Sequence, residues 1–462
     1  MGLFGTMFTG YSGLFSDIIA MDVTADNISN LNSIGFKRSR TEFMDILIGS
    51  NEIFCSEKGC GTAVKNIKTL FTQGSIQTTD IPTDLAIIGK GFFPVIDKEG
   101  NIFYTRDGQF FINEADETHY ALQNSLGMYL LGADPDAIQV TFGDLKPELI
   151  PKIIPAKATS VIEAQLIFDS RKPTNSNNLL EKYNANNLEE PLEEGYYQWA
   201  WEFPVYDPMG NEIYLKLYTD KTENFNEYEI LLTLADPSLD GRGDGKLKGA
   251  FLYGKLCFGD TGLIESAEFY EIPSPDANIN NLPELDLTKI GKPKFTLNVQ
   301  GRTQEITLDL GFEVNSDGSY TLYTDSSKFL AQSFAQLFYT QDGYPLGMFD
   351  RVEVITENGL IKAWYTNGKD IEVAKIFLAD FTGYEDTLTR VGKNLFVSNS
   401  DPIFFSPGID ERGKVLSGAL EGSNVDLAYE MLNLIVLQRA FQSNAKVITT
   451  ADQILEEFLR YT

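Results

Sequence analysis

Heptad repeats of apolar residues occupy both ends of this chain, and the long stretch between them alternates in the manner of β-strands. Near the N-terminus, apolar side chains recur at steps of four and three, a spacing typical of a coiled-coil seam: Met7, Tyr11, Leu14, Ile18, Met21, Ala25 and Ile28. Near the C-terminus they fall seven apart, with Gln438 as one polar exception: Leu427, Leu434, Phe441, Ile448 and Leu455, with Met431, Ala445 and Leu459 between. The pattern predicts two long helices that pair, which brings the ends of the chain together.

Both expected helices carry more apolar surface than one partner can cover. Val23 and Leu31 lie off the first seam, and five residues lie off the second: Leu437, Ala440, Val447, Ile454 and Phe458. Two ordinary amphipathic helices packed on a globular core are the simpler alternative. The run from Met7 to Ile28, however, makes a rod of about 33 Å at 1.5 Å per residue, which is long for a globular helix. We therefore expect an assembly interface with neighbouring copies, formed by Met7, Tyr11, Leu14, Ile18, Met21, Ile28, Leu427, Met431, Leu434, Phe441, Ile448 and Leu455.

Length and charge exclude several classes of function. A chain of 462 residues is too long for one ordinary core, so two or three domains are expected. The formal net charge of −29 argues against a nucleic-acid partner, because phosphate binding needs a cationic face. No apolar stretch approaches the roughly 18–20 residues needed to span a bilayer, so we expect no membrane insertion. A secretory signal peptide is not expected either, because no Lys or Arg precedes Lys37.

Turn signals divide the chain into discontinuous parts. Short apolar runs alternate with hairpin turns before and after a long central stretch, and both flanks belong to one domain if the ends pair. The expected fold is mainly β, with discontinuous β-domains and paired N- and C-terminal α-helices. The expected parts are a helical domain of residues 1–33 and 424–462, connectors at 34–74 and 407–423, a β-domain of 75–158 and 335–406, and an inserted β-domain of 159–334. Lys37, the first cation after the N-terminal helix, suits either the helix dipole or a solvated basic stretch.

The sequence offers little for catalysis or metal binding. The single histidine, His119, follows a turn at an expected strand edge, and 66 acidic residues make any chosen carboxylate pair uninformative. Asp236, Asp240 and Asp244 lack the spacing of a calcium-binding EF-hand, so a solvated acidic loop is favoured. We expect no enzyme activity, no cofactor and no metal.

Three cysteines are too few for a disulfide framework. Free thiols are the first interpretation, a local bridge between Cys55 and Cys60 the second, and a metal site the third. Cys257 lies far from both in the sequence.

Several short motifs resemble those of bacterial flagellar rod and hook proteins. They are ADNISNLNSIGFK at 25–37, TDLAIIGKGFF at 83–93, QDGYPLG at 341–347, LEGSNVDLA at 420–428 and its continuation QRAFQSNAKVITTAD at 438–452. They occur at both ends and in the flanks, whereas most of 159–334 matches no such motif. The resemblance therefore concerns the terminal parts of the chain more than its middle.

The resemblance implies a structural subunit of the flagellar hook. Many copies would polymerise into a flexible hollow tube that couples the rod to the filament, with the terminal helices as a coiled-coil-like inner layer. The β-domain of the flanks would form the wall, and the inserted domain would lie outside. The resemblance also implies type III export without a cleaved signal, an extracellular place in the hook and basal body, and contacts with other rod and hook-associated proteins. The alternatives are a distal rod protein of the same family, which usually lacks a large inserted domain, and a secreted β-rich adhesin or hydrolase.

Overall fold

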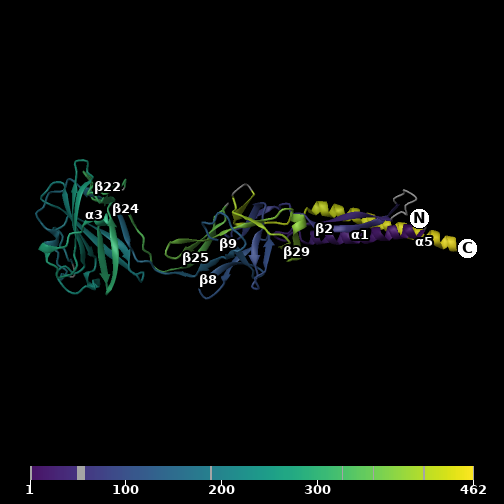
Figure 1. Ribbon diagram of the computed structural model, residues 1–462, viewed down its shortest axis with the longest axis horizontal. Coiled ribbons are helices and arrows are strands. Elements are labelled where there is room, and N and C mark those ends of the chain that lie inside the picture. Colours follow the sequence, from purple (N-terminus) through teal and green to yellow (C-terminus); the bar gives the residue numbers. More distant parts are fainter. Residues whose placement is uncertain are drawn as a thin grey trace. The chain divides into compact units, whose positions relative to one another are not determined.

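The computed structural model describes residues 3–48, 58–187, 190–324, 326–356, 358–408 and 412–460 (Figure 1). The fold is mainly β, with 44% strand and 18% helix, and the helices at the two ends of the chain pack together, as the sequence predicts. The chain divides into two compact units. The first contains Met1–Lys152 and Phe349–Thr462, and the second contains Ile153–Met348.

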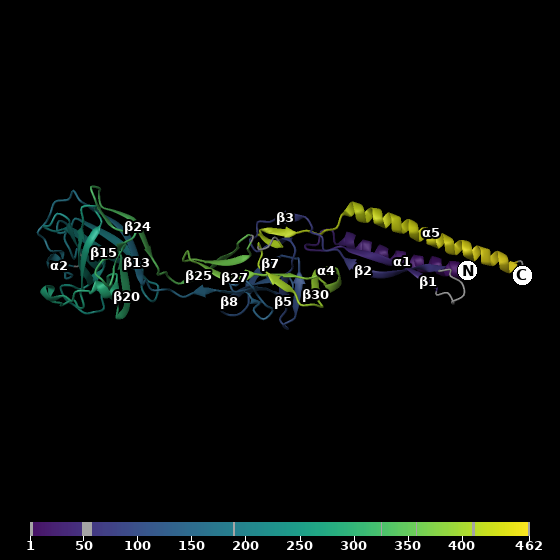
Figure 2. The same cartoon turned by 45° about the horizontal axis from the view of Figure 1, so that its top comes forward.

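The first unit contains two long helices, α1 (Leu3–Ser29) and α5 (Leu427–Arg460). They lie side by side in both views (Figures 1 and 2). Asp426 caps the start of α5, because its Oδ1 accepts hydrogen bonds from the backbone N–H groups of Ala428 and Tyr429 at 2.9 and 3.2 Å. After α1 the chain turns through Gly35, whose φ of +68° is a left-handed conformation that glycine adopts without strain.

A long hairpin follows α1 in the segment 34–74, which the sequence predicts to be a connector. Strand β1 (Ser39–Ile48) pairs antiparallel with β2 (Lys58–Thr69). The hairpin packs along α1, where Ser12 Oγ accepts a hydrogen bond from Thr62 N at 3.3 Å and Ser16 Oγ donates one to Thr62 O at 3.3 Å. The hairpin therefore covers one side of the N-terminal helix.

The β-part of the first unit combines strands that precede the second unit in the chain with strands that follow it. Three small pairs join β3 (Ile76–Thr78) to β33 (Ala419–Glu421), β4 (Leu85–Gly89) to β32 (Gly413–Ser417), and β28 (Leu378–Asp380) to β31 (Ile403–Phe405). The main sheet has the order β25 (Gly347–Val354), β26 (Leu360–Tyr365), β27 (Asp370–Ile376), β9 (Tyr129–Ala133), β5 (Phe93–Ile96), β6 (Ile102–Thr105), β30 (Leu395–Ser398) and β29 (Leu388–Gly392). At its side, β8 (His119–Asn124) pairs with β7 (Phe110–Glu114), β9 and β11 (Leu149–Pro151), and β10 (Lys146–Pro147) pairs with β9. The one-turn helix α4 (Tyr384–Thr387) precedes β29.

The second unit contains two sheets with an apolar core between them. The antiparallel meander has the order β14 (Trp199–Tyr206), β15 (Glu212–Lys221), β16 (Glu227–Leu234), β17 (Ala250–Phe258) and β18 (Ile264–Glu271). The other sheet has the order β19 (Lys294–Val299), β20 (Arg302–Asp309), β13 (Val161–Asp169) and β23 (Lys328–Leu330), with β24 (Ala335–Gln341) also on β13. Buried side chains of both sheets form the core, such as Phe168 of β13 and Phe203 of β14.

Short elements complete the second unit. Strand β12 (Ile153–Ile154) pairs with the first residues of β25, and β21 (Phe312–Val314) pairs with β22 (Tyr320–Leu322). Four helical turns are also present: α2 (Leu179–Lys182), η1 (Pro237–Leu239), η2 (Ile279–Asn281) and α3 (Leu287–Ile290). Helix α2 contributes Leu179 and Leu180 to a second apolar cluster, together with Tyr218, Leu231 and Tyr253 of the meander. The meander is therefore covered on both faces.

One expectation about the acidic loop changes with the structure. Asp240 does not lie in a solvated loop: its side chain is buried, and it pairs with Arg242 at 2.9 Å and accepts a hydrogen bond from Gly249 N at 2.7 Å.

Cys60 and Cys257 are free thiols, in agreement with the first interpretation of the cysteines. Cys55 lies outside the described residues, and so does the alternative of a Cys55–Cys60 bridge. Among the residues that the structure describes, no helix is long and apolar enough to cross a membrane.

Candidate assembly interface

Helix α1 packs against the rest of its unit through small and polar side chains. Six of its buried positions recur at steps of three and four: Gly10, Gly13, Asp17, Ala20, Thr24 and Asn27. Ser12 and Ser16 are buried beside them. A Cβ atom on Gly10 would lie 2.9 Å from Ile448 Cγ1, and one on Gly13 would lie 2.6 Å from Asn444 Nδ2. The two glycines therefore permit a separation between α1 and α5 that a larger side chain would prevent.

A polar contact links the two helices at the same level. Asn444 Nδ2 donates a hydrogen bond to Asp17 Oδ2 at 2.9 Å, in a partly buried setting. Burial raises the pKa of Asp17 above its ordinary value, and the hydrogen bond from Asn444 acts in the opposite direction. An apolar side chain at either position would leave a buried polar group without a partner, so this pair favours one axial register of α1 on α5.

The predicted seam of α1 lies one residue beyond each of these six buried positions. Tyr11 is 62% exposed and Ile18 is 41% exposed. Met7, Leu14, Met21 and Ile28 are half-buried, and Ala25 is exposed. The heptad period is therefore present, but the fully buried stripe is the adjacent one, about 100° around the helix. A coiled-coil packing of the predicted seams remains a prediction.

Aromatic side chains form a further stripe on α1 that the sequence analysis missed. Phe4, Phe8 and Phe15 are all more than half exposed, and with Tyr11 and Ile18 they recur at steps of four and three. We call Phe4, Phe8, Tyr11, Phe15 and Ile18 the aromatic stripe. Tyr11 and Ile18 belong to the predicted seam, whereas Phe4, Phe8 and Phe15, although they follow the same four-and-three spacing in the sequence, were not among the predicted interface residues.

Helix α5 presents two apolar faces of different burial. Four members of its predicted seam are half-buried, at intervals of seven: Leu434, Phe441, Ile448 and Leu455. The other two predicted members, Leu427 and Met431, are exposed. Further exposed apolar residues lie along the helix outside that seam: Leu432, Ile435, Val436, Val447 and Ile454. We call these five residues the aliphatic face of α5.

This distribution is the reverse of that expected for a soluble monomer. Large apolar residues of α1 are exposed while Asp17, Thr24 and Asn27 are buried. Burying one large apolar side chain contributes about 1.5–3 kcal/mol, so the aromatic stripe alone offers a further copy on the order of 10 kcal/mol. Contiguous exposed apolar surface of this kind marks an interaction site.

A buried cluster of charges ties the base of the helices to the β-part of the first unit. Glu421 lies 2.7 Å from Lys37 Nζ and 3.1 Å from Arg106 Nη1, and the side chains of Glu421 and Lys37 are fully buried. Glu421 Oε1 also accepts a hydrogen bond from Gly74 N at 2.9 Å, and Lys37 Nζ donates one to Thr72 O at 2.8 Å. We call Lys37, Arg106 and Glu421 the charged hub.

The environment of Lys37 differs from both sequence-based expectations. It is neither solvated nor directed at the carbonyl end of α1, because its ammonium group binds Glu421 and the Thr72 carbonyl. Burial lowers the pKa of Lys37 from its ordinary value, while the charge of Glu421 opposes that shift. Lys37 belongs to the 25–37 motif and Glu421 to the 420–428 motif, so the two terminal motifs meet at this hub.

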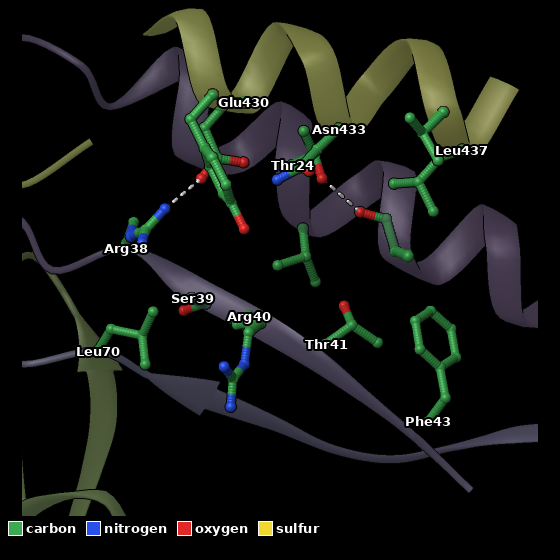
Figure 3. Close-up of a pocket in the computed structure, with 14 residues that line it drawn as sticks. Thr24, Arg38, Ser39, Arg40, Thr41, Phe43, Leu70, Glu430, Asn433 and Leu437 are labelled. Carbon is green, nitrogen blue, oxygen red and sulfur yellow. Dashed lines mark hydrogen bonds and ion pairs between the residues drawn. The ribbon is translucent and has the colours of Figure 1, made fainter. Parts of the chain in front are cut away.

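A pocket of about 260 Å³ lies between α1, β1 and α5 (Figure 3). Its polar side has the ion pair between Arg38 Nη1 and Glu430 Oε1, at 3.2 Å. Its apolar side includes Phe43, Leu70 and Leu437. No group of three or more His, Cys, Asp or Glu side chains that could hold a metal ion occurs within the described ranges. The pocket can therefore accept an apolar side chain, but it lacks the groups of a metal centre.

Three family models match separate parts of the chain. The model described as flagellar hook protein FlgE/F/G D1 domain matches residues 86–162, the flagellar basal body protein FlaE D2 domain matches 174–344, and the flagellar basal body rod FlgEFG protein C-terminal model matches 416–460. Among solved structures, the flagellar hook protein FlgE2 of Helicobacter pylori has a TM-score of 0.45 and 16% sequence identity, over 73% of this chain and 98% of that chain.

Curated relatives match over nearly the whole chain. The flagellar hook protein FlgE of Borreliella burgdorferi is 32% identical, over 98% of this chain and 99% of the relative. The flagellar hook proteins FlgE of Treponema pallidum and Salmonella typhimurium are 26% and 28% identical, over 98% and 96% of this chain and the same shares of those relatives. The chain therefore belongs to the flagellar hook protein FlgE family and is a structural subunit of the flagellum, not an enzyme.

Proposed function

We propose that the exposed apolar faces of α1 and α5 hold neighbouring copies of this hook subunit together in a flexible hollow tube between rod and filament. The observation that carries the proposal is the aromatic stripe, which is exposed in the single chain although its residues are large and apolar. The hook family to which the chain belongs forms polymeric flagellar assemblies. Copies of the same chain are therefore the natural partners of this surface.

The two apolar faces differ in composition, which favours a head-to-tail contact. The aromatic stripe of α1 is rich in phenylalanine, and the aliphatic face of α5 is rich in leucine, isoleucine and valine. When the stripe of one copy packs on the aliphatic face of the next, the pair keeps one free surface of each kind, an aliphatic face on the first copy and an aromatic stripe on the second. A heterologous contact of this type propagates into an open helical polymer unless its rotation closes a ring.

The division of the chain suggests a layer for each part. We assign the terminal helices, 1–33 and 424–462, to the channel lining, and the β-domain of 75–158 and 335–406 to the wall. Residues 159–334 then form the outer part, with 34–74 and 407–423 as connectors. Stiff β-domains joined to helices by such connectors suit a tube that bends while it transmits torque, provided that contacts between copies can switch among packings of similar energy.

Family membership also supports an assignment of location and of other partners. We assign the chain to the extracellular hook, next to the basal body, after type III export without a cleaved signal. Other rod and hook-associated proteins would contact the two ends of the polymer. Because the formal net charge is −29, solvent-facing and inter-copy surfaces must accommodate many carboxylates.

Single substitutions to aspartate, one on each long helix, test the proposal. Ile18→Asp places a charge in the aromatic stripe, and Leu434→Asp places one in the half-buried seam of α5. We expect the concentration needed for polymerisation to rise at least tenfold, because the lost burial is worth about 1.5–3 kcal/mol and each 1.4 kcal/mol is a factor of ten. Electron microscopy and sedimentation measure the polymer, and circular dichroism checks that the β-domains remain folded.

Thr449→Asp is the matched control, since Thr449 is an exposed polar residue of α5. It adds the same charge without touching an apolar face, so tubes should still form. Normal tubes from Ile18→Asp would contradict the assignment of the aromatic stripe. Loss of tubes from the control alone would show that charge and not apolar packing governs assembly.

A further inference from the structure

Two carboxyl side chains lie side by side on one face of a sheet inside the second unit. Asp220 of β15 and Glu229 of β16 are paired residues of neighbouring antiparallel strands, so their side chains lie on the same face of the meander. Both are buried, with 0% and 2% of their surfaces exposed. Like charges directly opposite each other destabilise a sheet, which makes a buried pair of carboxylates unusual.

The pair is bonded to the segment that covers this face of the meander. Glu229 Oε1 accepts a hydrogen bond from Leu179 N at 3.0 Å, and Asp220 Oδ2 accepts one from Asn175 Nδ2 at 2.9 Å. Leu179 and Asn175 both lie in residues 175–183, which we call the strap. The strap ends at Tyr183, whose hydroxyl donates a hydrogen bond to Lys248 O at 2.7 Å. The two carboxyl groups thus lie between the strap and the sheet.

The surroundings do not neutralise two negative charges. On β17, Lys255 is the strand partner of Glu229, but its ammonium group lies 3.5 Å from Glu227 and 41% of its side chain is exposed. Lys221 is on the opposite face of β15, and its ammonium group donates to the carbonyls of Ser170 and Lys172. The Tyr253 hydroxyl donates to Glu229 Oε2 at 2.9 Å.

Asp220 remains incompletely bonded within this arrangement. Its Oδ1 atom is buried and has no hydrogen-bond partner within the described part of the chain. A buried acceptor without a partner costs free energy that opening to water would restore. Burial of this oxygen without a partner therefore destabilises the closed strap relative to the open strap when Asp220 is charged.

We propose that Asp220 and Glu229 form a pH-sensitive latch, which keeps the strap closed while the pair holds at least one proton and lets it open when both groups ionise. Opening admits water to both carboxylates, which removes the desolvation that the closed state imposes on them. The latch concerns the inserted domain alone and does not depend on the proposed assembly.

The direction of the pH effect follows from the folded-state pKa values. Burial raises the pKa of Glu229 to about 7, with a smaller contribution from the charge of Asp220, and burial raises the pKa of Asp220 to about 6. For Glu229, hydrogen bonds from Tyr253 and the Leu179 backbone and the charge of Lys255 lower the pKa again. For Asp220, the Lys221 backbone and Asn175 do the same. Because the folded unit binds more protons than the unfolded chain, its stability is full below the ordinary carboxyl pKa near 4 and falls as pH rises through about 7. The charge of Asp220 contributes to the raised pKa of Glu229, so the two titrations are linked.

Amide hydrogen exchange of the full-length monomer tests the latch directly. After correction for the intrinsic exchange rate, we expect the protection of the strap amides to fall at least tenfold between pH 5.5 and pH 8. The amide of Leu215, in the core of β15, should keep its protection. The thermal midpoint of the second unit should also fall by about 5 °C or more over this range, since 1 kcal/mol corresponds to roughly 2–4 °C for a domain of this size.

Two conservative variants separate the latch from general effects of pH. Glu229→Gln keeps an oxygen acceptor for Leu179 N but cannot ionise, and Asp220→Asn does the same for Asn175. Each should reduce the pH dependence of strap protection by at least half. Glu265→Gln, at an exposed carboxylate of β18, is the matched control and should leave it unchanged. Equal pH dependence in wild type, Glu229→Gln and Asp220→Asn would overturn the proposal, as would a wild-type strap insensitive to pH.

Discussion

Glu421 is the residue at which the separate parts of the first unit meet. It is bonded to Lys37, which follows α1, and to Arg106, which follows β6, while Glu421 itself ends β33 and precedes α5. The sequence motifs included Lys37 and Glu421, so their importance could be predicted from resemblance. Their pairing could not, because it joins residues 384 positions apart and includes Arg106, which no quoted motif contained.

At the residue scale, removing the charge of Glu421 should destabilise the first unit. Glu421→Gln leaves Lys37 and Arg106 buried without a counter-charge, which typically costs about 3–5 kcal/mol. Urea unfolding followed by the fluorescence of Trp364 measures the loss, in a chain whose other tryptophans, Trp199 and Trp201 of the second unit, are replaced by Phe. Trp364 then reports on β26 of the first unit. Asp350→Asn is the control, because the Asp350–Arg351 pair is more than half exposed on average and should contribute under about 1 kcal/mol. Equal losses in the two variants would contradict the structural role of the hub.

At the level of the elements, the period of an apolar pattern predicts that a helix forms more reliably than it predicts which face of that helix packs against its own chain. Both terminal helices occur where the heptads predicted them. The fully buried face of α1, however, contains Gly10, Gly13 and Asp17, one position from the apolar seam. The usual rule assigns apolar residues to the interior of the same chain. A subunit that buries its apolar residues against other copies reverses that rule, and a single sequence does not state which case applies.

The glycines of α1 give a second prediction at this scale. Gly13→Leu should separate α1 from α5, because even its Cβ would lie 2.6 Å from Asn444 Nδ2. Leucine favours helix by up to about 1 kcal/mol relative to glycine, so any loss of order cannot be attributed to helix propensity. Limited proteolysis of the full chain should cut α1 at least several-fold faster.

Ala25→Leu supplies the comparison for this experiment. Ala25 is exposed on the same helix, so the same side chain can be added there without a collision. Proteolysis of this variant should match that of the wild type. Unchanged proteolysis of Gly13→Leu would show that close approach at this glycine is not needed for pairing.

At the scale of the whole molecule, the sequence was most informative about class and least informative about strand pairing. Paired terminal helices and a mainly β middle followed from periodicity, and the family followed from the motifs. The pairings inside 159–334 could not be derived. Strand β13, for example, pairs parallel with β20 and β23 and antiparallel with β24. More than a hundred residues separate β13 from each of these partners in the sequence. Alternating patterns identify strands but contain no information about such distant partners.

We propose that this hook subunit polymerises through apolar helix faces left exposed in the single chain. Electron cryo-microscopy of the assembled tube is the decisive experiment, because it places each side chain relative to the neighbouring copies. We expect the aromatic stripe to be buried against other copies, while Gly10 and Gly13 remain packed on α5 of their own chain. A tube in which Phe8, Tyr11 and Ile18 face open solvent, with copies joined only through their β-domains, would contradict it.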